Sequence, residues 1–257
     1  TTGFIASTFM RGVSYFQVPT SMLSMVDSSI GGKTAINTSR GKNMVGSFFQ
    51  PKGVIIDPDF LETIAGKEIF SAMSEVVKYS ILFDKIFFSY LNKNIEKIIE
   101  RDQKTLMKII TKCCELKANI VSIDEFDNGK RKLLNFGHTF GHALEFNSNL
   151  EIDHGQSVAY GILFATFYSF NEKKLSKKNF DKIFKFFKKI HLPKLKKLKF
   201  SSLLSLMKND KKNDNDGINF VLIKDMGQPY IEKINDEKII KYLEDFYEYI
   251  SYKWTKP

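Results

Sequence analysis

The sequence predicts a short α/β segment over residues 1–60, followed by a mainly helical domain over residues 61–257 that includes a small hairpin. Three observations lead to this fold class. The chain has 257 residues, which is enough for two modest domains with buried cores. Its first part is rich in Gly, Ser and Thr and carries short β-type runs. Long helical periodicity starts at about residue 61.

Apolar runs closed by turn signals predict two strands in the first segment. Residues 13–18 end at Pro19, and residues 53–56 are followed by Asp57-Pro58. Between these runs lies the glycine-containing stretch 27–34, which we expect to form a turn or a loop.

Apolar residues at helical spacing dominate the rest of the chain. The stretches with this spacing are residues 64–81, 106–116, 180–187 and 236–252. Residues 209–217 are polar and predict a loop. The β-type run that follows contains a Met226-Gly227 turn, so residues 218–232 predict a hairpin.

The net charge of +10 is concentrated in one window. Residues 172–199 contain 12 lysines, no arginine and two acidic residues, an excess equal to that of the whole chain. This distribution disfavours a protein that binds nucleic acid over its entire surface. Five of the lysines fall largely opposite the apolar residues of the window, so we interpret it as a solvated helix face. They are Lys174, Lys178, Lys182, Lys185 and Lys189. A basic protein that binds nucleic acid through this window is the distant alternative.

Cysteine usage and hydropathy indicate the compartment. Cys113 and Cys114 are adjacent and badly placed to bridge distant segments, which favours a reducing, cytoplasmic environment. The longest apolar stretch, residues 159–170, is too short and too broken to cross a membrane. No charged leader precedes an apolar run. The first residue is Thr1 and not Met, so we expect the native protein to begin elsewhere.

Three of the four histidines, His138, His142 and His154, fall within 17 positions. His138 and His142 are four residues apart and share a helix face. Glu75 interrupts an apolar helix face, where a buried carboxylate needs a cation. Three such donors with an open position are typical of catalytic Zn²⁺. Surface histidines and an ion-paired glutamate fit the spacing equally well.

The glycine stretch offers a second candidate site. Gly31-Gly32-Lys33-Thr34 is not a nucleotide-binding P-loop, because Asp27 stands where the first glycine should be. Its backbone N–H groups, a lysine and two hydroxyls could still bind a phosphate, with further donors from Arg11 and Lys42-Asn43. An ordinary turn is the simpler interpretation.

Several long motifs occur in one order along the chain. They are Gln17-Val18-Pro19-Thr20, Val26-Asp27-Ser28-Ser29-Ile30-Gly31-Gly32-Lys33-Thr34, Gly41-Lys42-Asn43, Gln50-Pro51, Ser74-Glu75-Val76-Val77-Lys78-Tyr79, Asn135-Phe136-Gly137-His138-Thr139-Phe140-Gly141-His142-Ala143 and His154-Gly155. In this combination the chain resembles 3-dehydroquinate synthase, and the match continues through Asp210-Lys211-Lys212 to the hairpin. These motifs distinguish the chain from metalloenzymes of the glycerol dehydrogenase type, which are related in fold but lack these sequence motifs.

The resemblance implies the remnant of a Rossmann-like dinucleotide-binding domain over residues 1–60 and a helical metal- and substrate-binding domain after it. It implies a lyase of the shikimate pathway to chorismate and the aromatic amino acids, with NAD and Zn²⁺ or Co²⁺ as cofactors. Enzymes of this family convert 3-deoxy-D-arabino-heptulosonate 7-phosphate to 3-dehydroquinate and phosphate, by transient oxidation, phosphate elimination, re-reduction and aldol closure. The implied partners are this small phosphorylated sugar acid and a second subunit of a cytoplasmic homodimer, with no nucleic acid and no membrane.

Matching motifs also imply roles for single residues. The metal ligands would be Glu75, His138 and His154, which makes His142 a catalytic residue and corrects the interpretation from spacing. The implied substrate-binding residues are Arg11 (toward a neighbouring subunit), Asp27, Lys33, Asn43, Lys78, Lys117, Arg131, Asn135, His142 and Lys212 (or Lys211). Of these, Lys33, Lys78, Asn135 and His142 are the implied catalytic residues. The implied NAD-binding residues are Thr20, Ser21, Lys33, Lys42, Phe60, Leu61, Glu62 and Thr63.

The chain departs from the family pattern at several points. The Gly-Gly-Gly-x-x-Gly-Asp stretch usual before this point is absent, so we expect a fragment or the product of a shortened gene. Asp127 stands where a Glu is usual, and Ser80 replaces a Gly. Gln156 replaces a Glu, which we expect to weaken the support of His154. A catalytically silent remnant is therefore the main alternative to an active enzyme.

Overall fold

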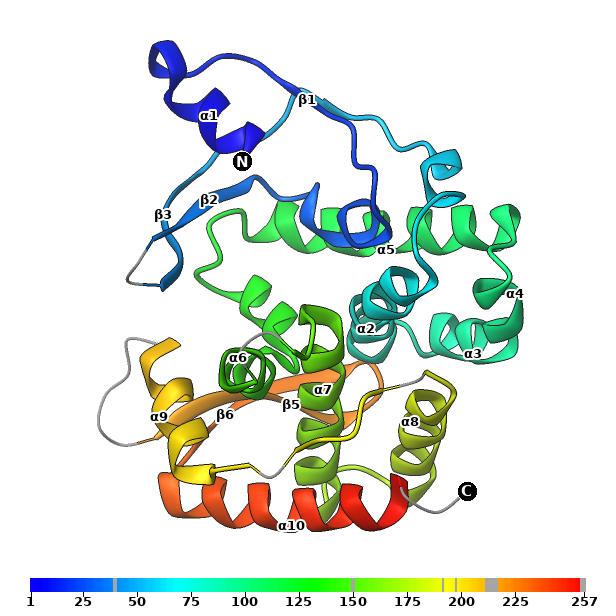
Figure 1. Ribbon diagram of the computed structural model, residues 1–257, viewed down its shortest axis with the longest axis vertical. Coiled ribbons are helices and arrows are strands. Elements are labelled where there is room, and N and C mark those ends of the chain that lie inside the picture. Colours follow the sequence, from blue (N-terminus) through cyan, green and yellow to red (C-terminus); the bar gives the residue numbers. More distant parts are fainter. Residues whose placement is uncertain (39–40, 149–150, 191, 197, 211–216, 255–257) are drawn as a thin grey trace. The chain divides into compact units, whose positions relative to one another are not determined.

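The chain divides into two compact units that interleave along the sequence. The computed structural model describes residues 1–38, 41–148, 151–190, 192–196, 198–210 and 217–254 (Figure 1). The first unit contains Thr1–Ala72 and Glu96–Arg131, and the second contains Met73–Ile95 and the chain from Lys132 onward. The helix α2 (Gly66–Phe83) contributes to both units. The domain division at residue 60, which the change in composition and periodicity predicts, stays a prediction.

A short parallel ladder joins two strands of the first unit. β1 (Phe16–Gln17) pairs with β4 (Gly53–Val54), and the Ile55 N–H extends the pairing with a 2.9 Å hydrogen bond to the Gln17 carbonyl. The two predicted strands are confirmed in position. The predicted length of the first one is wrong, because its partner offers so short a ladder.

An antiparallel hairpin in the first unit was not predicted. It consists of β2 (Lys33–Thr38) and β3 (Gly41–Phe48), and it starts within the predicted glycine turn. Ile36 and Val45 are partly exposed, so the strands have no buried face and show no clear apolar alternation. The Ser47 hydroxyl donates a 2.9 Å hydrogen bond to the Ser7 hydroxyl of α1 (Thr2–Thr8).

Helix α5 (Gln103–Ile123) follows α4 (Ile95–Ile99) and forms much of the core of the first unit. The Asp102 side chain accepts the Thr105 N–H at its start, and Leu106, Ile109 and Ile110 are buried, as their spacing predicts. The helix packs against the turn Ser24–Ser28.

Helix α7 (His154–Asn171) is the centre of the second unit. Its residues 157–169 are all buried, and α6 (His138–Asn147), α8 (Lys177–Lys189), β5 (Ile218–Asp225) and α10 (Asp236–Trp254) pack around it (Figure 1). The longest apolar stretch of the sequence is therefore protein core. None of the helices in the described part of the chain is long and apolar enough to cross a membrane.

The predicted C-terminal hairpin is confirmed. β5 pairs antiparallel with β6 (Gln228–Ile234), and Gly227 occupies the turn with a φ of 83°. The Gly227 N–H donates to the Ile81 carbonyl at 2.8 Å, which ties the hairpin to α2. Helix α9 (Phe200–Asp210) reaches into the predicted polar loop, and residues 211–216 lie outside the described ranges. Helix α3 (Lys85–Lys93), also in the second unit, was not predicted.

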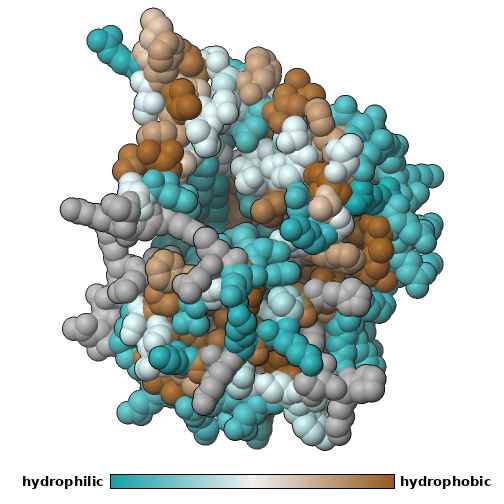
Figure 2. All heavy atoms as spheres, in the orientation of Figure 1, coloured by the Kyte–Doolittle hydropathy of each residue, from teal (hydrophilic) through white to brown (hydrophobic). Residues whose placement is uncertain are grey.

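Large apolar side chains lie on the surface of the first unit. Phe9, Met10 and Phe16 are 60%, 77% and 64% exposed. Figure 2 shows apolar surface over α1, at the top of the view. Contiguous exposed apolar surface is typical of a protein contact.

Candidate active site

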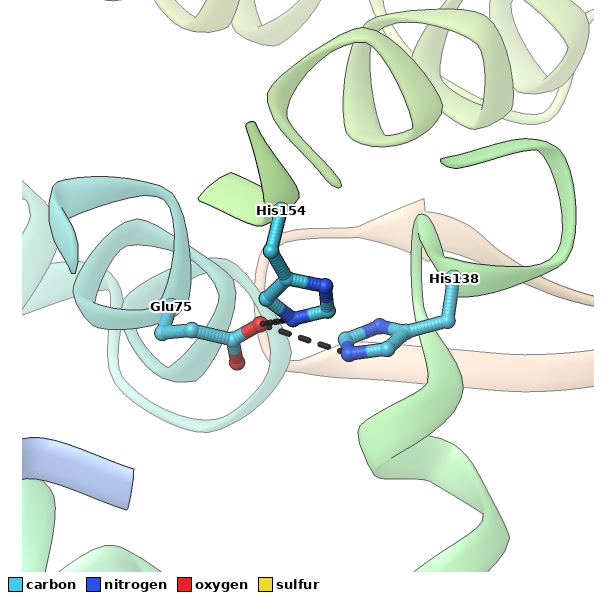
Figure 3. Close-up of side chains that lie close together, drawn as sticks. All are labelled: Glu75, His138 and His154. Atoms are coloured by element: carbon cyan, nitrogen blue, oxygen red, sulfur yellow. Dashed lines mark ion pairs between the residues drawn. The ribbon is translucent and has the colours of Figure 1, made fainter. Parts of the chain in front are cut away.

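Three potential metal ligands meet in the second unit (Figure 3). Glu75 lies in α2, His138 is the first residue of α6, and His154 is the first residue of α7. Glu75 Oε1 lies 3.3 Å from His138 Nε2 and 3.7 Å from His154 Nε2, and one donor atom of each residue lies within 4.8 Å of the others. The structure thus brings together the three residues that the resemblance implies as ligands.

Each imidazole is held through its other nitrogen. His138 Nδ1 lies 3.2 Å from the Phe136 carbonyl, and His154 Nδ1 lies 3.3 Å from Glu145 Oε2. Both contacts suit a ring that donates its Nδ1–H, which leaves Nε2 as the nitrogen available to a metal. Both Nε2 atoms then face the Glu75 carboxylate.

The Glu75 carboxylate is 1% exposed and forms an ion pair with Lys78, one turn further along α2. Among the described residues, neither of its oxygens has a hydrogen-bond partner of regular geometry. Burial raises the pKa of Glu75, but the Lys78 ammonium and the His138 ring lower it well below its ordinary value. A buried, ionised carboxylate beside two imidazole Nε2 atoms is a donor set that Zn²⁺ or Co²⁺ fits.

The two ligand candidates on α6 and α7 differ in charge. Burial lowers the pKa of His138, which keeps this ring neutral. Burial acts in the same direction on His154, but hydrogen bonds to Glu145 and Glu75 outweigh it and raise its pKa to about 9.

His142 lies one turn after His138 on α6 and is not a member of the three-residue cluster. Its ring centroid is 5.2 Å from that of His138 and 5.8 Å from that of His154. The geometry therefore does not favour the interpretation from spacing alone, in which both histidines of the i, i+4 pair are ligands. It leaves His142 beside the cluster, within reach of a molecule bound there.

Glycines explain why the two helix starts lie so close. Gly137 has a φ of 81°, and a Cβ on Gly161 would lie 1.7 Å from the Gly137 carbonyl oxygen. A Cβ on Gly141 would lie 2.9 Å from the Ser157 carbonyl oxygen. Helix α6 therefore crosses α7 with backbone against backbone, and this crossing carries His138 toward His154.

A capping box fixes the backbone at the start of α7. The Asp153 carboxylate accepts the Gln156 N–H at 2.9 Å, and the Gln156 side chain accepts the Asp153 N–H at 3.1 Å. The expected weakening of the support of His154 by Gln156 stays a prediction. Gln156 completes the cap as a Glu would, and it is Glu145 that contacts the ring.

Several of the other implied residues lie in the first unit and are tied together there. Lys33 forms an ion pair with Asp127, so the shorter carboxylate at this position still reaches its partner. Lys117 Nζ donates to the Asp27 carboxylate at 2.9 Å and to its carbonyl at 2.6 Å. Arg131 donates to the Gly31 carbonyl at 2.8 Å and fills the space beside the glycine turn.

A pocket of about 430 Å³ lies in the first unit. Its lining includes Thr20, Lys33 and Asn43, three of the implied substrate- or NAD-binding residues, together with Tyr15 and Ser28. Ser21 is not part of this lining, although its hydroxyl contacts that of Ser24 at 2.9 Å. Thr20 and Asn43 are exposed.

The implied segment Phe60 to Thr63 lies apart from the pocket lining. Its first two residues end the 3₁₀ turn Pro58–Leu61, and the Glu62 carbonyl accepts a 2.7 Å hydrogen bond from Arg101. Arg11 is exposed, and its φ of 65° lies in the left-handed region. The Lys42 side chain lies outside the described part of the structure, as do Lys211 and Lys212.

Lys78 and Asn135 belong to the second unit with the cluster. Lys78 is buried and faces Glu75, whereas Asn135 is half-buried at the end of the 3₁₀ helix Lys130–Asn135, just before α6.

Two residues that organise these sites were missed. Glu145 supports His154, and the Asp124 carboxylate accepts the N–H groups of Asn128, Gly129 and Arg131 at 2.7–3.0 Å. Glu145 stands between the apolar residues Leu144 and Phe146, a weaker form of the signal that singled out Glu75. Asp124 lies in a polar loop, where nothing in the sequence pattern distinguishes it.

Solved structures share the fold of this chain. The fold matches that of 2-epi-5-epi-valiolone synthase from Streptomyces hygroscopicus, solved with NAD⁺ and Zn²⁺, at a TM-score of 0.88 and 21% identity over 96% of this chain and 70% of that one. It also matches 2-deoxy-scyllo-inosose synthase, solved with carbaglucose-6-phosphate, NAD⁺ and Co²⁺, at a TM-score of 0.86 and 24% identity over 96% of this chain and 70% of that one. Glycerol dehydrogenase from Schizosaccharomyces pombe matches less well, at a TM-score of 0.65 and 19% identity over 98% of this chain and 67% of that one.

Sequence relatives then define the family. The 3-dehydroquinate synthase N-terminal model matches residues 1–71, and the C-terminal model matches residues 72–213. The enzyme named 3-dehydroquinate synthase in Thermoanaerobacter pseudethanolicus is 40% identical over 94% of this chain and 68% of its own length. That of Buchnera aphidicola subsp. Cinara cedri is 46% identical over 88% of this chain and 63% of its own length. The chain belongs to the 3-dehydroquinate synthase family, so the resemblance is confirmed, and it spans about two thirds of the length of these relatives.

Proposed function

We propose that this chain provides 3-dehydroquinate synthase activity, with NAD and Zn²⁺ or Co²⁺ as cofactors. The reaction converts 3-deoxy-D-arabino-heptulosonate 7-phosphate to 3-dehydroquinate and phosphate in the shikimate pathway. The observation that carries the proposal is the cluster of Glu75, His138 and His154, in a chain of this family. The fold neighbours solved with NAD⁺ and Zn²⁺ or Co²⁺ support the choice of cofactors.

In this proposal the three clustered side chains hold the metal and leave positions open for substrate hydroxyls. When bound, the metal supplies Lewis acidity that makes a coordinated hydroxyl easier to deprotonate. The imidazole of His142 can accept or return a proton beside the cluster, since its ring lies next to both histidine ligands. Lys78 balances the charge of Glu75 and is the cation nearest to it in the described structure.

The first unit supplies cationic and polar groups suited to an anionic sugar substrate and to NAD. The Lys33 side chain is 51% exposed and borders the pocket with Asn43 and Thr20. Lys117 and Arg131 are buried and hydrogen-bonded to the loop around Asp27 and Gly31. We assign these two a role in holding the loop in shape for substrate, in addition to the charge they bring.

We also propose a homodimer in the cytoplasm. Arg11 is exposed next to Phe9 and Met10, two large apolar side chains on the surface of the first unit. A contact between two copies would cover this surface and could carry Arg11 toward the partner's substrate phosphate. Light scattering of the chain and of Met10→Asp tests the dimer. A monomeric state of both proteins over the micromolar range contradicts it.

Phosphate release from 3-deoxy-D-arabino-heptulosonate 7-phosphate is the direct test of the activity. It is measured with NAD⁺ and Zn²⁺ for this chain and for a chain extended through the coding sequence upstream of Thr1. We expect release that is lost on chelation and restored by Zn²⁺. Glu75→Gln should abolish it, whereas Glu68→Gln, an exposed change in the first turn of the same helix, should not. No release from either chain with metal restored would favour the silent remnant.

A further inference from the structure

Glu145 is a second buried acidic residue near the metal cluster, and the sequence motifs assign it no role. It lies in α6, and its side chain is only 8% exposed. A carboxylate buried to this degree is costly unless hydrogen bonds or charges stabilise it. Its Oε2 atom lies 3.3 Å from His154 Nδ1.

The contact places His154 between two carboxylates. On one side of the ring, Nδ1 faces Glu145, and on the other, Nε2 faces Glu75 Oε1 at 3.7 Å. A ring that donates Nδ1–H to a carboxylate keeps its Nε2 lone pair for a metal and becomes a more basic ligand. His138 achieves the same orientation through the Phe136 carbonyl.

The ring of His154 is less restrained by packing than that of His138, so a hydrogen bond at Nδ1 matters more for its orientation. Its side chain is 35% exposed, against 15% for His138, so packing restrains its ring less. The capping box of Asp153 and Gln156 fixes the backbone of His154 but leaves the ring free to rotate. The contact with Glu145 restricts that rotation.

We propose that Glu145 is a positioning residue, which accepts the Nδ1–H of His154 and thereby aims Nε2 at the metal. This inference rests on the proposed function in one respect, that Glu75, His138 and His154 bind Zn²⁺ or Co²⁺. Glu145 does not itself touch the metal or the substrate in this role.

The test measures Zn²⁺ affinity by competition with a chromophoric chelator, in the chain and its variants. Glu145→Ala removes the acceptor and should weaken Zn²⁺ binding about 10- to 100-fold. Glu145→Gln keeps an oxygen acceptor and should cost less than about tenfold. Glu151→Gln is the matched control, because Glu151 is an exposed residue paired with Lys196 and losing its charge should leave the affinity unchanged. Circular dichroism checks that every variant is folded.

A double-mutant cycle separates positioning from a general structural effect. In a His154→Ala background, Glu145→Ala should cause no further loss of affinity, because the ring it orients is gone. The visible spectrum of the Co²⁺ form should change in Glu145→Ala and stay unchanged in Glu151→Gln. Equal losses in both backgrounds, or full affinity in Glu145→Ala, would overturn the inference. Failure of the unaltered chain to bind Zn²⁺ would instead contradict the proposed function.

Discussion

Two histidines that share one carboxylate have pKa values shifted in opposite directions. The pKa of His138 is lowered by burial, whereas that of His154 is raised to about 9 by its two acidic neighbours. Near neutral pH we therefore expect the metal-free chain to carry a proton on His154, whereas burial favours the neutral form of His138. That proton stabilises the folded chain at low pH, and its contribution is lost as the pH rises through about 9.

Zinc binding should consequently release close to one proton per chain in neutral solution. The metal needs the Nε2 lone pair of His154, so binding displaces the proton that Glu145 and Glu75 stabilise. The affinity should rise about tenfold per pH unit from about pH 7 and level off near about pH 9. Calorimetry in buffers of different ionisation enthalpy counts the protons. A count of zero, with an affinity independent of pH, would contradict this assignment.

At the scale of the helices, the crossing of α6 and α7 determines where the histidines lie. Its closest point is the backbone contact between Gly137 and Gly161, where there is no room for a side chain. The crossing is therefore sensitive to a single methyl group, although Gly161 itself touches neither a metal ligand nor a substrate residue of the proposal.

Gly161→Ala should destabilise the chain by at least about 2 kcal/mol, because its Cβ would overlap the Gly137 carbonyl. A fall of about 4 °C or more in the unfolding temperature is the expected readout, together with weaker Zn²⁺ binding. Gly66→Ala is the control, since its Cβ would meet no heavy atom closer than 4.0 Å. Similar unfolding temperatures for the two variants would show that the close crossing is not required.

The capping box of α7 offers a second comparison between helices. Asp153→Ala should cost about 1 kcal/mol and also weaken Zn²⁺ binding, because it frees the helix end that carries His154. Asp84 caps α3 by accepting the Ile86 and Phe87 N–H groups, so Asp84→Ala should cost a similar amount and leave the Zn²⁺ affinity unchanged. Equal effects of both variants on Zn²⁺ binding would argue against the local role of the cap.

Sequence patterns were sufficient for elements with one strong signal. Helical spacing predicted α2, α5, α8 and α10, and the β-type runs around Met226-Gly227 predicted the C-terminal hairpin. The hairpin of β2 and β3 could not be found in this way, because its strands are exposed and lack alternation. The role of Gly161 could not be predicted from the sequence either, because it depends on close contact with Gly137, which precedes another helix.

The residues of the candidate site likewise divide into those that sequence motifs predict and those that only tertiary contacts reveal. Sequence motifs predicted Glu75, His138 and His154 as metal ligands, and the structure places their donor atoms close together. Spacing alone had grouped His138 with His142, because it measures distance along one helix and not the approach of a second. The supporting contacts of Glu145 and Asp124 depend on tertiary packing and hydrogen bonding that no spacing rule describes.

At the scale of the whole molecule, the excess positive charge lies on one helix and the segments beside it. In α8 the phenylalanines are buried, whereas Lys178, Lys182 and Lys185 are exposed. This arrangement supports the interpretation of a solvated face. The lysines that give the chain its net charge are therefore different residues from the cations of the proposed site.

Replacing Lys178, Lys182 and Lys185 together by glutamine should therefore shift the unfolding temperature by less than about 2 °C. Zn²⁺ affinity should be unchanged. Neither protein should bind a labelled oligonucleotide at physiological salt in an anisotropy assay. Salt-dependent binding by the unaltered chain that disappears in the triple variant would revive the nucleic-acid alternative.

The origin of the three clustered side chains has a consequence for how long the protein persists in a cell. They come from three helices of the second unit, with Glu75 far from the histidines in sequence, so a bound ion acts as a removable crosslink. At a free zinc concentration 100 times the dissociation constant, it would add about 2.7 kcal/mol to the free energy of unfolding. Zinc starvation would then expose the chain to proteases. Metal supply would thus set the amount of this protein as well as its activity.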